Sequence, residues 1–179
     1  IMRALSSEAV AEFALPARLG SLFYLFIATA FVPLWGIFGA AIAAHDFRSV
    51  RREALRYSFA GLILVGFSSL TILFGLHGIM DFWASRQFEN QVLVVFGYSV
   101  FAMVIAFTSP WNMVLNAMGL VNVQIAAWAL FVSLSVLVKL AFVGVFDAWI
   151  VGFVSALFYI FFVTIPVVFS AFRAIERGL

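Results

Sequence analysis

The chain contains no cysteine and very little charge. Only 10% of its 179 residues are charged, 66% are hydrophobic, and the mean hydropathy is +1.18. Soluble domains carry about 25% charged residues, so the composition excludes a soluble globular domain. A disordered chain is excluded too, because disorder needs low hydrophobicity and high charge. The absence of cysteine excludes disulfides, cysteine-ligated zinc, iron–sulfur clusters and thiol catalysis.

The scarce charges leave long apolar intervals between them. The charge-free intervals run from Arg18 to Asp46, from Arg56 to Asp81, from Glu89 to Lys139 and from Asp147 to Arg173. A transmembrane helix needs about 20 apolar residues, because about 30 Å of hydrocarbon is crossed at about 1.5 Å per residue. The third interval is too long for one helix. A polar cluster around Gly119 predicts its turn at 117–122, and the cluster consists of Asn112, Asn116, Asn122 and Gln124.

These intervals predict an all-α integral membrane fold, with 1–179 forming a single transmembrane domain. The predicted spans are 19–44, 56–80, 90–116, 123–145 and 148–172. No segment shows the sustained alternation of a membrane β-strand. Because the first residues are mixed and the chain begins with Ile1, we expect a segment of a longer protein.

The basic residues predict the orientation. Four arginines follow the first span, namely Arg48, Arg51, Arg52 and Arg56. Placing them in the cytoplasm also puts Arg173, Arg177 and the C-terminus there, as the positive-inside rule favours. The net charge of +2 and pI near 9.4 therefore indicate membrane orientation rather than nucleic-acid binding. The four arginines are read as a topology determinant resting on anionic headgroups, or as a docking site for a pyrophosphate-bearing substrate.

The sequence shows no catalytic constellation, so we expect no enzyme, no cofactor and no metal. His45 and His77 fall near opposite membrane faces and cannot share a metal. Lys139 is the one charge well inside a predicted span. It either snorkels to the headgroups or lines a water-filled cavity that receives an anionic headgroup. Arg18, at the mouth of the first span, is an interface anchor or a second cavity cation.

Two further groups have alternative roles. Asn112 and Asn116 share one face of the third span, where they either bond to a neighbouring helix or contact substrate. Pro33, Pro110 and Pro166 lie within predicted spans. Each removes a backbone donor and can kink its helix, either as a static packing feature or at a transporter gate.

An ordered set of motifs resembles bacterial polysaccharide flippases. Glu8–Leu19, reading EAVAEFALPARL, is similar to the opening of a helix in the middle of those proteins, and a helix with a central proline follows. Next come His45-Asp46 with an Arg-Arg pair, and then Phe74–Trp83. Asn116-Ala-Met-Gly119 and Leu137-Val-Lys139-Leu complete the set, while Phe146–Gly152 departs from the family's usual Phe-Gly-x-x-Gly.

The family comprises the O-antigen and exopolysaccharide exporters of the multidrug/oligosaccharidyl-lipid/polysaccharide superfamily. The resemblance implies that these are the last five of about twelve helices, arranged as two six-helix halves. It implies alternating-access flipping of polyprenyl-pyrophosphate-linked oligosaccharide across the bacterial inner membrane. Implied partners are membrane lipids, the remaining N-terminal helices, the polysaccharide polymerase and glycosyltransferases. The alternatives are a multidrug antiporter or lipid II flippase of the same superfamily, and a non-transporting membrane scaffold.

Overall fold

A computed structural model describes residues 7–84, 90–146 and 149–178, and every regular element within these ranges is a helix. The elements in chain order are α1 (Ser7–Ala30), α2 (Leu34–Ala43), α3 (Phe47–Ala84), α4 (Gln91–Ala117), α5 (Val121–Phe146), α6 (Ile150–Tyr159), the π-helix η1 (Ile160–Thr164) and α7 (Ile165–Arg177). The predicted all-α fold is confirmed for the described part of the chain.

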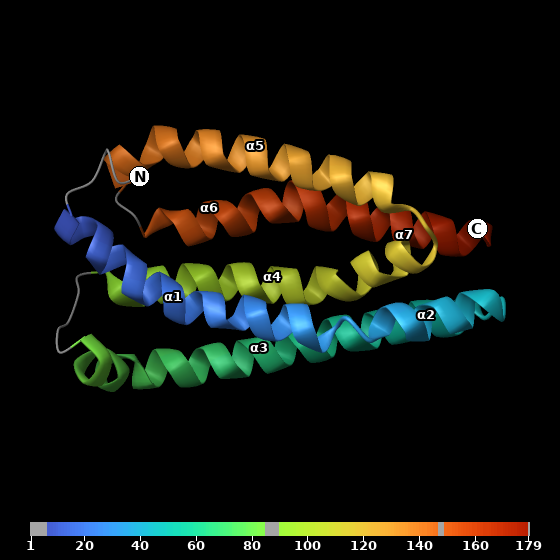
Figure 1. Ribbon diagram of the computed structural model, residues 1–179, viewed down its shortest axis with the longest axis horizontal. Helices are drawn as coiled ribbons and strands as arrows, with labels where there is room; N and C mark the ends of the chain where they lie inside the picture. Colours follow the sequence, from blue (N-terminus) through green and yellow to red (C-terminus); the bar gives the residue numbers. More distant parts are fainter. Residues whose placement is uncertain (1–6, 85–89, 147–148, 179) are drawn as a thin grey trace.

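The helices run in alternating directions along one elongated bundle (Figure 1). α1 and α2 make the first pass, α3, α4 and α5 the next three, and α6, η1 and α7 the last. The α2–α3 connection, the 118–120 turn and the C-terminus lie at the same end of the bundle (Figure 1). The arginines at the start of α3 therefore share one end with those of α7. Two further arginines of the chain, Arg3 and Arg86, lie outside the described residues.

Four described segments are long and apolar enough to cross a membrane, which indicates a multi-pass membrane protein. They are Phe47–Trp83, Gln91–Ala117, Val121–Phe142 and Ile150–Arg177. The predicted spans 90–116 and 123–145 agree closely with α4 and α5. The last pass continues to Arg177, beyond the predicted 148–172, and the start of that span at 148 lies outside the described residues.

The first predicted span, 19–44, is wrong as a single helix. α1 begins much earlier, at Ser7, and ends at Ala30, and α2 starts only at Leu34. Pro33 stands at the break and has no N–H to donate to the helix. The backbone compensates with two tighter bonds, from Leu34 N–H to the Phe31 carbonyl at 3.1 Å and from Trp35 N–H to the Val32 carbonyl at 3.2 Å.

The other two predicted kink positions, Pro110 and Pro166, leave their helices unbroken. Pro110 is buried inside α4. Pro166 lies in the first turn of α7, directly after the π-helix η1. A proline ring clashes with the carbonyl four residues earlier, and a π turn widens the helix at that point. At the same level the Thr164 hydroxyl lies 2.8 Å from that of Thr108 on α4.

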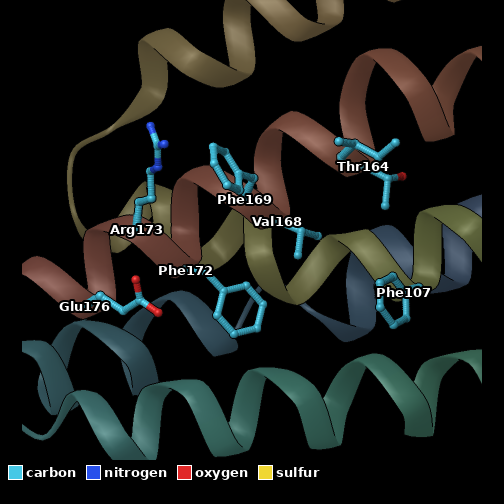
Figure 2. A pocket seen from close by; sticks show the side chains of 8 residues that line it. Phe107, Thr164, Val168, Phe169, Phe172, Arg173 and Glu176 are labelled. Carbon is cyan, nitrogen blue, oxygen red and sulfur yellow. The ribbon is translucent and has the colours of Figure 1, made fainter.

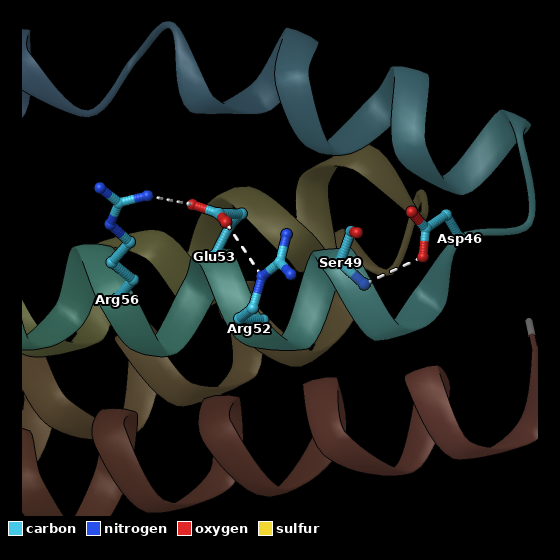
Figure 3. Close-up of polar contacts among 5 residues, drawn as sticks. All are labelled: Asp46, Ser49, Arg52, Glu53 and Arg56. Atoms are coloured by element: carbon cyan, nitrogen blue, oxygen red, sulfur yellow. Dashed lines mark hydrogen bonds and ion pairs between the residues drawn. The ribbon is translucent and has the colours of Figure 1, made fainter.

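The predicted span 56–80 is the inner part of a longer helix, because α3 already begins at Phe47. Asp46 caps this start: its Oδ1 accepts a hydrogen bond from the Ser49 N–H at 3.0 Å (Figure 3). Hydrogen bonds from Ser49, first from its side chain and then from its backbone, hold the pKa of Asp46 below its usual value of 3.8. The four arginines therefore lie on the first turns of a helix rather than in a loop.

α4 is the central helix and packs against every other pass. Its closest neighbour is α6, where Gly152 lies directly on the α4 backbone. A Cβ at Gly152 would lie 2.5 Å from the Gly97 carbonyl carbon and 2.7 Å from the Tyr98 nitrogen. Small residues allow such backbone approach in membrane helices, where packing replaces the hydrophobic drive between helices. The α4–α6 contact thus depends on the absence of a side chain at Gly152.

Gly152→Ala should lower the free energy of unfolding by about 1–3 kcal/mol, because the new methyl group must push α6 away from α4. Unfolding in detergent with increasing dodecyl sulfate measures the change. Gly36→Ala is the matched control, since nothing lies within 4 Å of a Cβ at Gly36 and that residue is also helical. Equal effects of the two variants would contradict the packing argument.

The Asp46 cap should depend on pH. Because folding lowers the pKa of Asp46, its contribution is fully present above about pH 3.8 and disappears as the pH falls through the folded pKa. Amide hydrogen exchange at Ser49 should accelerate, relative to other α3 amides, on acidification. Asp46→Asn keeps a capping oxygen without a titrating proton, so its exchange should lack this acid step. A persistent acid step in Asp46→Asn would assign the effect to another group.

Candidate functional site

A cavity of about 270 Å³ lies between α1, α4 and α5. In the described part of the chain, α1 and α5 make no contact with each other, and α4 and α6 lie between them. The cavity therefore lies where α1 and α5, which do not touch each other within the described residues, leave a face of α4 uncovered. Its lining residues are Gly20 and Ser21 from α1, Tyr98, Phe101, Ala102 and Ile105 from α4, and Trp128 from α5.

The cavity wall is largely aromatic and continues into the core. Trp128 meets Tyr159 edge-on with ring centroids 5.5 Å apart, and Phe101 meets the same tyrosine at 5.6 Å. Phe131 lies 5.3 Å from Tyr159 and completes the group. Edge-to-face contacts of this kind stabilise aromatic clusters and fix their orientation. The wall is consequently rigid on the α4–α5–α6 side, with Trp128 at the boundary between the core and the cavity.

Polar side chains are few in the cavity lining, and Ser21 on α1 is one of them. The Ser21 hydroxyl donates to the Arg18 carbonyl at 2.8 Å, so it serves its own helix. Tyr98 approaches α1 closely, and its Cβ occupies the space that a side chain at Gly20 would need. Gly20 and Tyr98 together set how near α1 comes to α4. Sequence reasoning missed these residues, since only the packing of α1 on α4 reveals them.

The structure places the two predicted cavity cations on the two helices that flank the opening. Arg18 is exposed on α1, one turn before Ser21. Lys139 is half-buried on α5, on the same face as Trp128 because 11 residues make about three turns. Lys139 lies roughly 16 Å from Trp128 along the helix axis. The two cations are therefore not shown to be in contact, and neither is among the residues that line the cavity.

Asn112 and Asn116 lie elsewhere, close to the 118–120 turn. The Gln124 side-chain amide donates to the backbone carbonyl of Asn112 at 3.0 Å and to the side-chain Oδ1 of Asn116 at 2.9 Å. This cluster fastens α5 to α4 at the turn. Neither asparagine lines the cavity between α1 and α5. Asn112 Oδ1 is buried and has no hydrogen-bond partner among the described residues.

The four arginines near the start of α3 differ in the groups that they contact. Glu53 accepts Arg52 at 3.2 Å and Arg56 at 3.6 Å, so two guanidinium groups share one carboxylate (Figure 3). Arg51 turns instead toward α7, with its guanidinium carbon 5.0 Å from the centroid of the Phe172 ring. Arg48 is exposed on the first turn. Among the four, Arg51 is the one whose contact reaches across the bundle within the described residues.

No group of three or more histidine, aspartate or glutamate side chains within the described ranges is placed to hold a metal ion. His45 precedes the start of α3, and His77 lies two turns from its far end. The chemistry that the cavity offers is binding, with an aromatic wall and one cation on each of the helices α1 and α5 that contribute to its lining. No protein-family model, curated protein or solved structure matches the chain.

Gln124→Leu should destabilise the α4–α5 pair by about 0.6–2 kcal/mol, the range measured for hydrogen bonds between membrane helices. The substitution removes both donated bonds but keeps the side chain's bulk. Detergent unfolding measures the change. Asn122→Leu is the control, because Asn122 is exposed at the start of the same helix. A loss no larger than that of the control would show that the cluster contributes nothing to stability.

Proposed function

We propose that this chain is the C-terminal five-pass part of a twelve-helix flippase of the bacterial inner membrane. It moves a polyprenyl-pyrophosphate-linked oligosaccharide between leaflets by alternating access, for O-antigen or exopolysaccharide synthesis. The observation that carries the proposal is the cavity between α1, α4 and α5, together with one cation on each of the helices α1 and α5, namely Arg18 and Lys139. The ordered motif resemblance supports the same function, and the C-terminus is then cytoplasmic.

A charged group inside hydrocarbon is costly, so a lysine within a membrane helix needs water or an anionic partner. Lys139 lies on α5 with mostly apolar neighbours along the helix, and a central lysine costs about 2.5–3.5 kcal/mol on translocon scales. A pyrophosphate passing the cavity would satisfy this charge. Sugars and pyrophosphate cannot cross lipid unaided, because unpaired polar and ionic groups are costly to bury.

The proposal assigns different tasks to the predicted site residues. Lys139 and Arg18 receive the substrate's negative charge from opposite sides of the opening. Asn112 and Asn116 keep α5 on α4, through Gln124, while the cavity changes its access. The break at Pro33 gives the first pass a joint between α1 and α2, of the kind transporters use at gates. The N-terminal half of the transporter closes the open face of α4.

Lys139→Ala in the full-length protein should reduce surface polysaccharide about tenfold and leave the lipid-linked precursor on the cytoplasmic leaflet. A hydrogen bond to a charged group contributes about 1.5–3 kcal/mol, which corresponds to roughly tenfold or more. Lys139→Arg should retain most transport. Surface polysaccharide and leaflet-resolved precursor are measured after depletion of the wild-type protein.

Leu140→Ala is the matched control, since Leu140 is the exposed neighbour on α5. Unchanged transport in Lys139→Ala would remove the cavity role of this lysine. The flippase function itself fails if depletion of the protein leaves the precursor's leaflet distribution and the surface polysaccharide unaltered.

A further inference from the structure

A second and larger hollow lies along α7, remote from the cavity between α1 and α5. This groove has a volume of about 510 Å³. Figure 2 shows it against α7 and α4, with α3 running alongside. Its lining comes from Phe107 of α4, Thr164 of η1, and Ile165, Val168, Phe169, Phe172, Arg173 and Glu176 of α7.

The groove is apolar along most of its length and opens outward. Its α7 residues recur at three- and four-residue intervals, so they form one face of the helix. Ile165 is 52% exposed and Phe169 is 54% exposed, so this face is uncovered in the described chain. Phe107 forms the floor and is held by Phe59 of α3, with ring centroids 5.9 Å apart. An apolar ligand reaching this groove would come from the hydrocarbon around the bundle.

The polar end of the groove carries Arg173, and Arg51 of α3 lies beside the lining residue Phe172. Arg173 lies 4.2 Å from the Phe169 ring centroid, and Arg51 lies 5.0 Å from that of Phe172. In Figure 2, Phe172 points toward α3 and Arg173 points away from it. Because Arg51 belongs to α3 and contacts the Phe172 ring, it approaches the groove from the α3 side. Neither arginine belongs to the ion pairs recorded for the described residues, which join Arg52 and Arg56 to Glu53.

The length of the groove corresponds to one leaflet. Thr164 and Glu176 are 12 residues apart, which is roughly 18 Å along a helix at 1.5 Å per residue. Half of a hydrocarbon core about 30 Å thick is about 15 Å. The arginine end lies at the same end of the bundle as the C-terminus (Figure 1). A single acyl chain therefore fits the apolar part when its headgroup lies at the arginines.

We propose that this groove is a binding site for an anionic phospholipid. One acyl chain lies along Ile165, Val168 and Phe169, and the phosphate lies between Arg51 and Arg173. Guanidinium groups bind phosphate oxygens through several donors, and aromatic rings beneath them hold their orientation. The site is independent of the transported substrate and serves to anchor the last pass to α3 through a bound lipid.

Glu176 at the mouth favours a singly charged phosphodiester over a more highly charged phosphate. Glu176 lines the groove together with Arg173, so its carboxylate reduces the local positive charge and repels each additional negative charge on a ligand. A pyrophosphate headgroup would meet more of this repulsion than the phosphodiester of a glycerophospholipid. The chain length that the groove accommodates, about one leaflet, also suits a phospholipid better than a long polyprenyl carrier.

The test uses the full-length protein in detergent, with bound lipids counted by native mass spectrometry. Phosphatidylglycerol and phosphatidylcholine with identical acyl chains are titrated separately. One site should bind phosphatidylglycerol more tightly than phosphatidylcholine. Arg51→Gln and Arg173→Gln should each weaken phosphatidylglycerol binding about fivefold, the equivalent of about 1 kcal/mol per basic residue at a lipid surface.

Two controls separate a defined site from general surface charge. Arg52→Gln and Arg56→Gln remove the same charge from the same helix but outside the groove, and they should leave the affinity unchanged. Val168→Phe fills the apolar part and should weaken both lipids equally, because it excludes the acyl chain rather than the phosphate.

Three results would overturn the proposal. Equal losses in all four arginine variants would show diffuse attraction to anionic lipid instead of a site. No loss in Arg51→Gln, Arg173→Gln and Val168→Phe would show that the groove holds no lipid. Displacement of phosphatidylglycerol by an equimolar amount of polyprenyl pyrophosphate would assign the groove to the lipid carrier.

Discussion

The fold depends on one constraint: a backbone polar group within hydrocarbon must find its hydrogen bond inside the protein. Regular helices meet this requirement residue by residue, so interruptions are confined to few places. The described breaks at His45–Asp46 and 118–120 lie at the ends of the bundle. The break within the first pass, at Pro33, is bridged by two short-range backbone bonds. The arrangement of the polar and charged side chains follows from these positions.

Because the connections lie at the ends of the bundle, the packing between helices determines how the passes associate. In lipid the approach of two helices relies on close contact and on a few interhelical hydrogen bonds. α4 uses both. Gly97 faces Gly152 of α6 with no side chain between the backbones, and Gln124 of α5 bonds to Asn112 and Asn116 near the turn. α1 and α5 are each held on α4 or α6 rather than on one another. The cavity between them results from this packing arrangement, in which the described residues of α1 and α5 do not touch each other.

Much of the fold follows from the positions of the charged residues, because a charge-free interval of sufficient length can only be a span in an apolar chain. The ends of α4 and α5 were predicted to within a few residues on this basis. The break at Pro33 was not, since the same proline could equally bend a continuous helix, as Pro110 shows by leaving α4 intact. Sequence could nominate Lys139 and Arg18 as unusual cations. It could not identify Tyr98, Gly20 or Trp128 as lining a cavity, because neighbours in space depend on which helices pack together.

The arginines near the start of α3 show the same limit most sharply. In the sequence Arg51 and Arg52 are adjacent and chemically identical, and a count of basic residues treats them alike. Adjacent positions on a helix differ by about 100° in direction, however, so the two side chains meet different surroundings. Arg52 reaches Glu53 on its own helix, whereas Arg51 reaches Phe172 across the bundle. A single cluster can therefore both orient the chain in the membrane and form part of a ligand site, and only the facing helix determines which arginine does the second.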